Sequence, residues 1–253
     1  MALFTMNIYS VNLGMQAKVN VVIPQKFNTG EIGVESGKKD NGFKCLYLLH
    51  GLSDDETIWL RRTSIERYAA QYGICVVMPC GDKSFYTDMK YGSKYYTYIS
   101  EELPKLISEF FHVSDKKEDT FIAGLSMGGY GALKVAMKNP DRYCKVAGLS
   151  SVADIKAVTE RFHDTFVPIF GEDVNIPDEE DLFKISEACN KNPEKPEIYL
   201  GVGTEDFLYE SNQKFKKHLE NIGYEFTYRE SAGMHNWFFW DEYIQYVLKW
   251  MFE

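Results

Sequence analysis

The sequence predicts an α/β fold in which a mainly parallel sheet carries helices on both faces. Short apolar runs alternate along the chain with longer amphipathic stretches, which is the pattern of strand–helix units. Several of the short runs are apolar without interruption, as expected for strands that are buried on both faces. No segment of about 20 to 50 residues repeats, which argues against solenoids and propellers.

The predicted strands are apolar runs bounded by Gly, Pro or polar residues, and they lie at residues 8–11, 19–23, 45–49, 74–78, 120–123, 146–149, 197–202 and 225–228. The predicted helices repeat apolar residues three and four positions apart, and they lie at 65–72, 96–111, 130–137, 210–221 and 237–251. We expect the first two strands to form a hairpin. Residues 28–42 are polar and rich in Gly and Lys, which predicts an exposed loop.

One long stretch, residues 154–196, contains no clean strand. We interpret it as a lid-like helical insertion over one end of the sheet, within a single domain that spans residues 1–253. Its acidic run, residues 178–181, is typical of a solvated helix N-terminus, which the helix dipole favours.

Composition excludes several classes of function. Lys plus Arg is 28 and Asp plus Glu is 37 among 253 residues, so the formal net charge is −9. Nucleic-acid binding needs a basic face, which this balance does not favour. The longest apolar runs are far shorter than the roughly twenty residues of a membrane span. The N-terminal residues show no cationic stretch of the kind that begins a secretory signal.

The five cysteines are scattered, odd in number and form no CxxC pair. This pattern favours free thiols in a reducing compartment over a disulfide framework. We therefore expect a soluble, acidic, cytoplasmic enzyme. No spacing typical of metal ligands is present, and we expect no metal and no cofactor.

The motif that indicates chemistry is Gly-Leu-Ser-Met-Gly at residues 124–128, which matches GxSxG. It follows a predicted strand directly and precedes a helix, which is the setting of a nucleophile elbow. Side chains at Gly124 and Gly128 are expected to collide across the sharp turn, so both positions need glycine. The pattern thus predicts Ser126 as a nucleophile with its hydroxyl held away from the sheet.

A serine nucleophile needs a base that is oriented by a carboxylate, in the chain order Ser, acid, His for this type of fold. His235 lies in a loop between the last predicted strand and the last helix, where it can reach Ser126. Asp206 follows the strand at 197–202 and is the preferred acid, with Glu205 as the alternative. Taken alone, Asp206 is equally typical of a helix N-cap.

The oxyanion hole is expected to use two backbone N–H groups. One belongs to Met127, the residue after the nucleophile, and the other to the loop that begins at His50. Gly51 allows the backbone to approach the substrate, and the Leu52 N–H is the predicted second donor. The His50 ring is expected to bind backbone and fix the loop.

The chain resembles the α/β-hydrolase fold and, more narrowly, the esterase D group, closest to bacterial tributyrin and acetyl esterases. The residues that carry the resemblance are distributed over nearly the whole chain and lie at 48–53, 59, 78–79, 85–88, 91–92, 96–111, 124–129, 203–206 and 233–237. The resemblance implies a serine carboxylesterase for short-chain acyl esters, such as acetyl, butyryl or tributyrin-like esters. It also implies small-molecule partners and a dimer or tetramer.

The same triad serves several alternative activities: feruloyl or cinnamoyl esterase, acetyl-carbohydrate esterase, S-formylglutathione hydrolase-like thioesterase, and acyltransferase. S-formylglutathione hydrolases usually carry a cysteine after His-Gly-Leu, but residues 53–57 here contain none. This departure favours simple carboxylic esters. A catalytically silent binding module is disfavoured because the predicted triad is intact.

Aromatic side chains near the predicted site are candidates for the substrate pocket: Trp59, Phe85, Tyr86 and Trp237. The alternative is that such residues pack helices onto the sheet, which we expect of most other aromatic residues nearby. Phe162, Phe166, Ile169 and Phe170 in the insertion are further candidates to cap an acyl group.

Overall fold

A computed structural model describes residues 1–25 and 42–253. Its centre is one eight-stranded sheet with the strand order β1-β2-β4-β3-β5-β6-β7-β8. The strands are β1 (Ala2–Ser10), β2 (Met15–Ile23), β3 (Cys45–Leu49), β4 (Cys75–Pro79), β5 (Thr120–Leu125), β6 (Lys145–Leu149), β7 (Glu197–Gly203) and β8 (Phe226–Ser231). Strands β4, β3 and β5 to β8 run parallel, whereas β1 pairs with β2 and β2 with β4 antiparallel.

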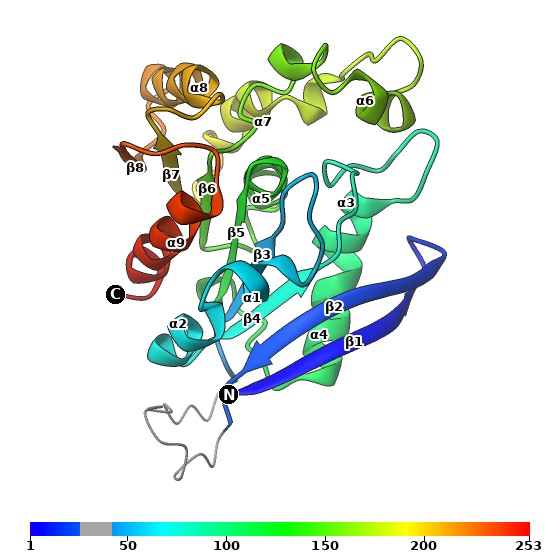
Figure 1. Cartoon of the computed structure of the whole chain (residues 1–253), viewed down its shortest axis with the longest axis vertical. Coiled ribbons are helices and arrows are strands. Elements are labelled where there is room, and N and C mark those ends of the chain that lie inside the picture. Colours follow the sequence, from blue (N-terminus) through cyan, green and yellow to red (C-terminus); the bar gives the residue numbers. More distant parts are fainter. Residues whose placement is uncertain (26–41) are drawn as a thin grey trace.

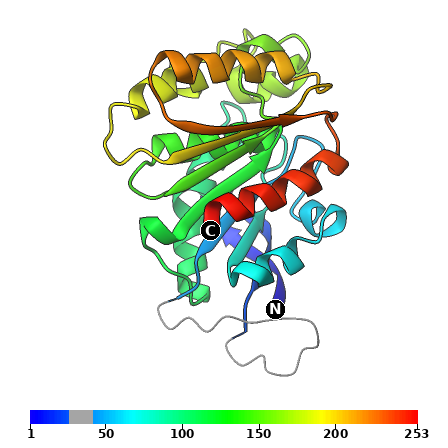
Figure 2. The same cartoon turned by 90° about the vertical axis from the view of Figure 1, so that its left-hand side faces the viewer.

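Two layers of helices enclose the sheet, as Figures 1 and 2 show. One apolar cluster joins one face of the sheet to α3 (Tyr95–Thr97), α4 (Leu103–Phe110), α5 (Met127–Lys138), α6 (His163–Phe170), α7 (Leu182–Cys189) and α8 (Tyr209–Asn221). A second cluster joins the other face to α1 (Ile58–Arg62), α2 (Ile65–Tyr72) and α9 (Trp237–Phe252). The predicted fold class is thus confirmed, with side chains of the central strands alternating between the two clusters.

The N-terminal hairpin is longer than predicted. Both strands have nine residues and pair from Ala2 with Ile23 to Ser10 with Met15. Strand β1 lies at the edge of the sheet and leaves most of its side chains exposed, so its sequence lacks the continuous apolar character of a buried strand. The predicted loop at 28–42 lies outside the described residues except for Gly42.

The predicted helix at 96–111 is interrupted. A π-helical turn, Tyr98–Glu102, separates α3 from α4. Pro104, in the first turn of α4, has no N–H with which to bond the carbonyl of Ser100 four residues earlier. The guanidinium of Arg142 donates to that carbonyl instead. The α1 turn, which was not predicted, has five residues and is too short to show a helical period.

Residues 154–196 contain helices and no strand, as expected. They form two short 3₁₀ helices, η3 (Lys156–Val158) and η4 (Asp178–Glu180), and the α-helices α6 and α7, between strands β6 and β7. In Figure 1 this segment lies at the end of the molecule away from both termini, next to α5. Only Asp178–Glu180 of the acidic run is helical; Asp181 caps α7 by accepting from the Phe183 N–H.

Candidate active site

The strand–turn–helix around Ser126 is tighter than the sequence predicted. Strand β5 continues to Leu125 and helix α5 starts at Met127, so Ser126 alone forms the turn. Its φ of 55° and ψ of −117° lie outside the regions that L residues favour. From residue 120 to 137 every side chain is buried except Ser126, so the turn presents one hydroxyl at the surface of an otherwise buried unit.

The two glycines of the motif are required for different reasons. A Cβ built at Gly124 would lie 2.3 Å from the carbonyl oxygen of Gly128, which confirms the predicted collision across the turn. A Cβ at Gly128 would instead lie 2.5 Å from the carbonyl oxygen of Leu49 and 2.6 Å from that of His50. The expectation for Gly128 was therefore wrong in its partner: this glycine lets α5 approach the end of β3.

Ser126, His235 and Asp206 are brought into one hydrogen-bonded line. The Ser126 Oγ lies 3.0 Å from His235 Nε2, and His235 Nδ1 lies 2.9 and 3.0 Å from the two Asp206 oxygens. Because a carboxylate only accepts, Nδ1 carries the proton in this arrangement and Nε2 accepts from the serine hydroxyl. This is the tautomer that a general base requires.

The loops that carry the acid and the base are joined by their backbones. Glu205 donates its N–H to the carbonyl of Gly233 at 3.0 Å, and a Cβ at Gly203 would lie 2.2 Å from that same oxygen. Glycine at position 203 thus permits the contact between the loops that follow β7 and β8. Asp206 is buried, whereas the side chain of Glu205 is exposed, so the geometry favours Asp206 over the alternative acid.

Asp206 also stabilises the turn before α8, because its Oδ1 accepts the Leu208 N–H at 2.8 Å. It is not the N-cap of that helix: the cap position is Leu208, which makes no side-chain cap bond. The carboxylate is therefore held by backbone on one side while it binds the imidazole on the other.

Two aromatic rings hold the His235 imidazole. The Phe207 ring lies 4.6 Å from it, and the Trp240 ring lies 4.9 Å away at 90°. The Trp240 indole donates to Ser150 Oγ at 3.1 Å. Above Phe207 lies the Arg161 guanidinium, 4.2 Å from the ring centroid, so the insertion reaches the site through this side chain.

Sequence reasoning missed Phe207, Trp240 and Arg161. Phe207 directly follows the predicted acid and Trp240 lies on the helix after the predicted base. Nearness in sequence does not show which way an aromatic ring points.

Asp54 was also missed. A Cβ at Gly51 would lie 3.2 Å from Asp54 Oδ2 and 3.7 Å from Ser126 Cβ, so a carboxylate and the nucleophile flank the same glycine. Burial raises the pKa of Asp54, and a hydrogen bond from the Gly51 backbone partly offsets that increase.

The predicted oxyanion donors lie at the two segments that flank Ser126. Within the described part of the chain, neither the Met127 nor the Leu52 backbone N–H donates to a backbone acceptor, so both stay the predicted donors. The His50 ring binds backbone as expected. Its Nε2 accepts the Gly81 N–H at 2.8 Å, and its Nδ1 lies 2.7 Å from the carbonyl oxygen of Gly51.

Three of the four predicted pocket residues are buried in the core. Trp59, Phe85 and Tyr86 are at most 1% exposed. The polar side-chain atoms of Trp59 and Tyr86 bind backbone. The Trp59 indole donates to the Leu49 carbonyl at 3.1 Å, and the Tyr86 hydroxyl donates to the His50 carbonyl at 2.9 Å. The prediction failed because aromatic residues near a motif in sequence pack beneath the site as readily as they line it.

The fourth pocket candidate, Trp237, is half-buried and packs edge-on against Trp59 and Trp240, at 5.1 and 5.2 Å. It therefore borders the aromatic layer behind His235. Among the insertion candidates, Phe166, Ile169 and Phe170 are buried in the core and Phe162 is half-buried.

Within residues 1–25 and 42–253, no group of three or more His, Cys, Asp or Glu side chains is placed to hold a metal ion. No helix of this part of the chain has the length and apolarity needed to cross a membrane.

Comparison with known proteins gives a consistent result. A family model described as "Putative esterase" matches residues 10–251. An acetyl esterase of Caldicellulosiruptor saccharolyticus is 29% identical over 264 aligned positions, covering 99% of this chain and 98% of that protein.

Two solved structures from Staphylococcus aureus are also similar. A substrate-bound, fluorophosphonate-binding serine hydrolase is 33% identical with a TM-score of 0.89, covering 100% of this chain and 98% of that one. An S-formylglutathione hydrolase is 32% identical with a TM-score of 0.87, covering 100% and 99%.

Proposed function

The chain belongs to the esterase family and is a carboxylic ester hydrolase, and we propose that it hydrolyses short-chain acyl esters through an acyl-enzyme on Ser126. The observation that carries this proposal is the unbroken line of hydrogen bonds from the Ser126 hydroxyl through His235 to Asp206. A hydroxyl becomes a useful nucleophile at neutral pH only with such a base.

In the proposed reaction, His235 Nε2 takes the hydroxyl proton as Ser126 Oγ attacks the ester carbonyl carbon. The resulting oxyanion accepts from the Met127 and Leu52 N–H groups. When the intermediate collapses, the carbonyl–alkoxy bond breaks, and His235 returns the proton to the departing alcohol. The acyl group remains on Ser126.

Water completes the cycle by the same route. His235 removes a proton from the water molecule as its oxygen attacks the acyl carbon, and the bond to Ser126 Oγ breaks when the proton returns to the serine. The Asp206 carboxylate stabilises the imidazolium that forms in each step. The products are a carboxylic acid and the free enzyme.

Three observations support short-chain acyl esters as the substrate class. The acetyl esterase relative aligns over nearly the full length of both chains. The loop after His-Gly-Leu, residues 53–57, contains no cysteine, which departs from the pattern usual in glutathione thioester hydrolases. The net charge of −9 also suits a neutral ester, which needs no attraction by a basic surface.

A thioesterase for S-acyl glutathione is the second candidate. The observation that favours it is the 32% identity to the S-formylglutathione hydrolase structure over the whole chain. The same triad would cleave a thioester, with a thiolate as the leaving group in place of an alkoxide.

The test is a panel of p-nitrophenyl esters of increasing acyl length together with S-formylglutathione. We expect the highest kcat/KM for acetyl or butyryl esters, and at least a 10⁴-fold loss, in order of magnitude, for Ser126→Ala. Ser64→Ala, which removes an exposed serine at the start of α2, is the matched control and should keep full activity. A preference for S-formylglutathione over every oxygen ester would select the second candidate.

A fluorophosphonate probe tests the nucleophile separately. It should label the wild-type protein and Ser64→Ala but not Ser126→Ala. Labelling of Ser126→Ala at the wild-type rate would contradict the assignment of the nucleophile. Adding an acceptor alcohol then distinguishes hydrolysis from acyl transfer, because a transferase would form a new ester at the expense of free acid.

A further inference from the structure

Two neighbouring residues behind the site have an unfavourable backbone. Phe85 and Tyr86 have φ values of 50° and 51°, in the left-handed region that favours glycine, and both are fully buried. Such a conformation persists only where the surroundings hold it in place. The contacts of this segment therefore show what it is built to position.

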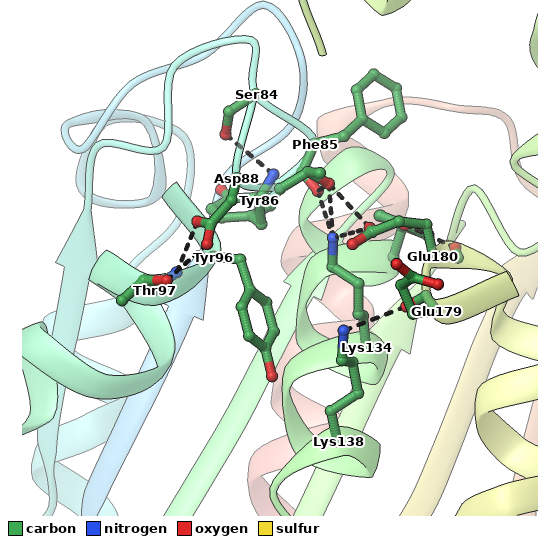
Figure 3. A network of polar contacts seen from close by, with 12 residues as sticks. Ser84, Phe85, Tyr86, Asp88, Tyr96, Thr97, Lys134, Lys138, Glu179 and Glu180 are labelled. Carbon is green, nitrogen blue, oxygen red and sulfur yellow. Dashed lines mark hydrogen bonds and ion pairs between the residues drawn. The ribbon is translucent and has the colours of Figure 1, made fainter. Parts of the chain in front are cut away.

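A buried ammonium group holds the segment from the side of α5. Lys134 Nζ donates to the Phe85 carbonyl at 3.3 Å, to Thr87 Oγ1 at 2.7 Å and to Glu180 Oε2 at 2.5 Å. The Tyr130 hydroxyl donates to the same Glu180 oxygen at 2.9 Å. Figure 3 shows Lys134 extending from α5 to the Phe85 carbonyl with the carboxylate of Glu180 beside it.

The Tyr86 ring occupies a space that only glycine leaves open. A Cβ at Gly81 would lie 2.3 Å from one ring carbon of Tyr86, and a Cβ at Gly131, on α5, would lie 2.3 Å from another. The ring is thus held between two backbones, and its hydroxyl has one direction to point. It donates to the carbonyl oxygen of His50 at 2.9 Å.

The His50 carbonyl is the place where the two halves of the predicted oxyanion hole meet. Its oxygen receives the Tyr86 hydroxyl and also lies against Gly128, where a Cβ would come within 2.6 Å. Gly128 follows Met127, which carries one predicted oxyanion donor, while Leu52, two residues after His50, carries the other. A shift of this carbonyl would change the distance between the two donors.

We propose that Tyr86, fixed by Lys134 and Glu180, is a positioning residue that sets the oxyanion loop His50–Leu52 against the nucleophile turn. The inference rests on the proposed function, because it concerns the same oxyanion. Tyr86 acts through the His50 carbonyl and Lys134 through the Phe85 carbonyl, while Glu180 holds the Lys134 ammonium. The insertion takes part through Glu180, which lies in η4.

Tyr86→Phe is the direct test, because it removes the hydroxyl and leaves the ring. We expect kcat to fall about 10- to 100-fold with KM within about twofold, since loss of a whole oxyanion donor typically costs about 10²- to 10³-fold. The matched control is Tyr98→Phe. Tyr98 is equally buried, but its hydroxyl has no hydrogen-bond partner within the described residues, so kcat should not change.

Inhibition by a trifluoromethyl ketone that carries the acyl group of the substrate gives a second measurement. The affinity for this ketone per active site does not change when part of the protein is merely unfolded. Ser126 Oγ adds to the ketone carbon, His235 takes the hydroxyl proton, and the anionic hemiketal oxygen occupies the oxyanion hole. The active sites are counted by labelling a sample with the fluorophosphonate probe. The affinity of Tyr86→Phe for the ketone, expressed per active site, should fall by the same factor as kcat/KM. Affinity for the carboxylic acid product should stay within about twofold.

A second variant keeps the proposal open to refutation if Tyr86→Phe does not fold. Lys134→Met combined with Glu180→Leu removes both charges of the buried pair together, which proteins often tolerate. It should show the same selective loss in kcat and in ketone affinity. Wild-type values for both quantities, in either folded variant, would overturn the proposal.

The two proposals fail in different ways. If the wild-type protein hydrolyses no ester in the panel, the proposed function fails, and ketone affinity still measures positioning. If wild-type and Tyr98→Phe are active while Tyr86→Phe equals them, the function stands and the positioning role is refuted.

Discussion

Helix α5 joins two polar arrays that differ in exposure and in the way the chain builds them. At its N-terminus, Ser126 meets His235, whose side chain is 19% exposed. Two turns later, Lys134 and Glu180 form an ion pair in which the lysine side chain is 0% exposed. The first array has to reach substrate and water, whereas in the second the lysine is fully buried and the side chain of Glu180 is only 9% exposed.

The difference teaches how each array is stabilised. The triad lies on three loops at strand ends, and the Asp206 carboxylate also accepts the Leu208 N–H. The buried pair joins α5 to the insertion by the contact between Lys134 and Glu180, and Lys134 also donates to the Phe85 carbonyl. Breaking the first should therefore cost activity with little stability, and breaking the second should cost stability as well.

The largest expected effect tests the exposed array. Asp206→Asn should lower kcat about 10⁴-fold, because an amide donates to Nδ1 and favours the wrong imidazole tautomer. The neighbouring exposed carboxylate supplies the control, Glu205→Gln, which should keep kcat within about twofold. Steady-state kinetics on a butyryl ester measure both. Equal losses of kcat in the two variants would contradict the choice of Asp206 over Glu205 as the acid of the triad.

The second effect tests the buried array. Glu180→Gln leaves the Lys134 ammonium buried without a counter-charge, which typically costs about 3–5 kcal/mol of unfolding free energy. Burial acts to raise the pKa of Glu180, but the charge of Lys134 together with hydrogen bonds from Lys134 and Tyr130 holds it below its usual range, which favours the carboxylate. Urea unfolding at pH 7 measures the change.

Glu179→Gln is the control for this experiment, since Glu179 precedes Glu180 and is exposed. It should shift the unfolding free energy by less than about 0.5 kcal/mol. The comparison between the two arrays would be wrong if both variants lost the same amount. Removing both members of the pair should cost less than removing Glu180 alone.

The third effect lies between the arrays, at His50. Burial holds the pKa of His50 below its usual value, although Asp55 and Asp82 act in the opposite direction. The unfolded chain binds a proton near pH 6.5, so the unfolded state holds more protons between that value and the folded-state pKa. Stability should thus fall as pH falls below about 6.5, by at most about 1.4 kcal/mol per pH unit.

Urea unfolding between pH 8 and pH 5 measures this slope. His50→Gln should flatten it, whereas His112→Gln, at an exposed histidine, should leave it unchanged. A slope that is identical in wild type and His50→Gln would show that other groups cause the dependence.

The smallest effect concerns the turn of the nucleophile. At Ser126, with its φ of 55°, glycine should give a protein about 1 kcal/mol more stable than alanine does, although both variants are inactive. At Ser108, on the exposed side of α4, the order should reverse by a similar amount. Thermal unfolding of the four variants checks the signs. The same order at both positions would argue against backbone strain at the nucleophile.

Motif and chain order predicted the exposed array because each member lies where a parallel strand ends. Gly124 and Gly128 identified the turn, and the order Ser, Asp, His selected Asp206 and His235. The fold class followed from strand–helix alternation, and the structure confirms it. These features are local in sequence or follow from the direction of parallel strands.

The buried array could not be predicted because nothing in its sequence pairs Lys134 with Glu180, 46 positions away. A lysine in an amphipathic helix is usually solvated. The burial of Phe85 and Tyr86 was missed for a related reason. The sequence does not show whether an aromatic residue near a site lines the pocket or packs in the core behind it. At the π-helical turn, the Ser100 carbonyl accepts from Arg142, which is distant in sequence from Pro104 and Ser100.

The order of strands in the sheet has a consequence for folding as well. The nucleophile follows β5, in the middle of the sheet, whereas the base follows β8, the edge strand opposite β1. A partly folded chain that has assembled β3 to β6 already holds the serine turn but has no base beside it. Recovery of ester hydrolysis during refolding should therefore lag behind formation of the central sheet, and would report when the last strand and α9 dock.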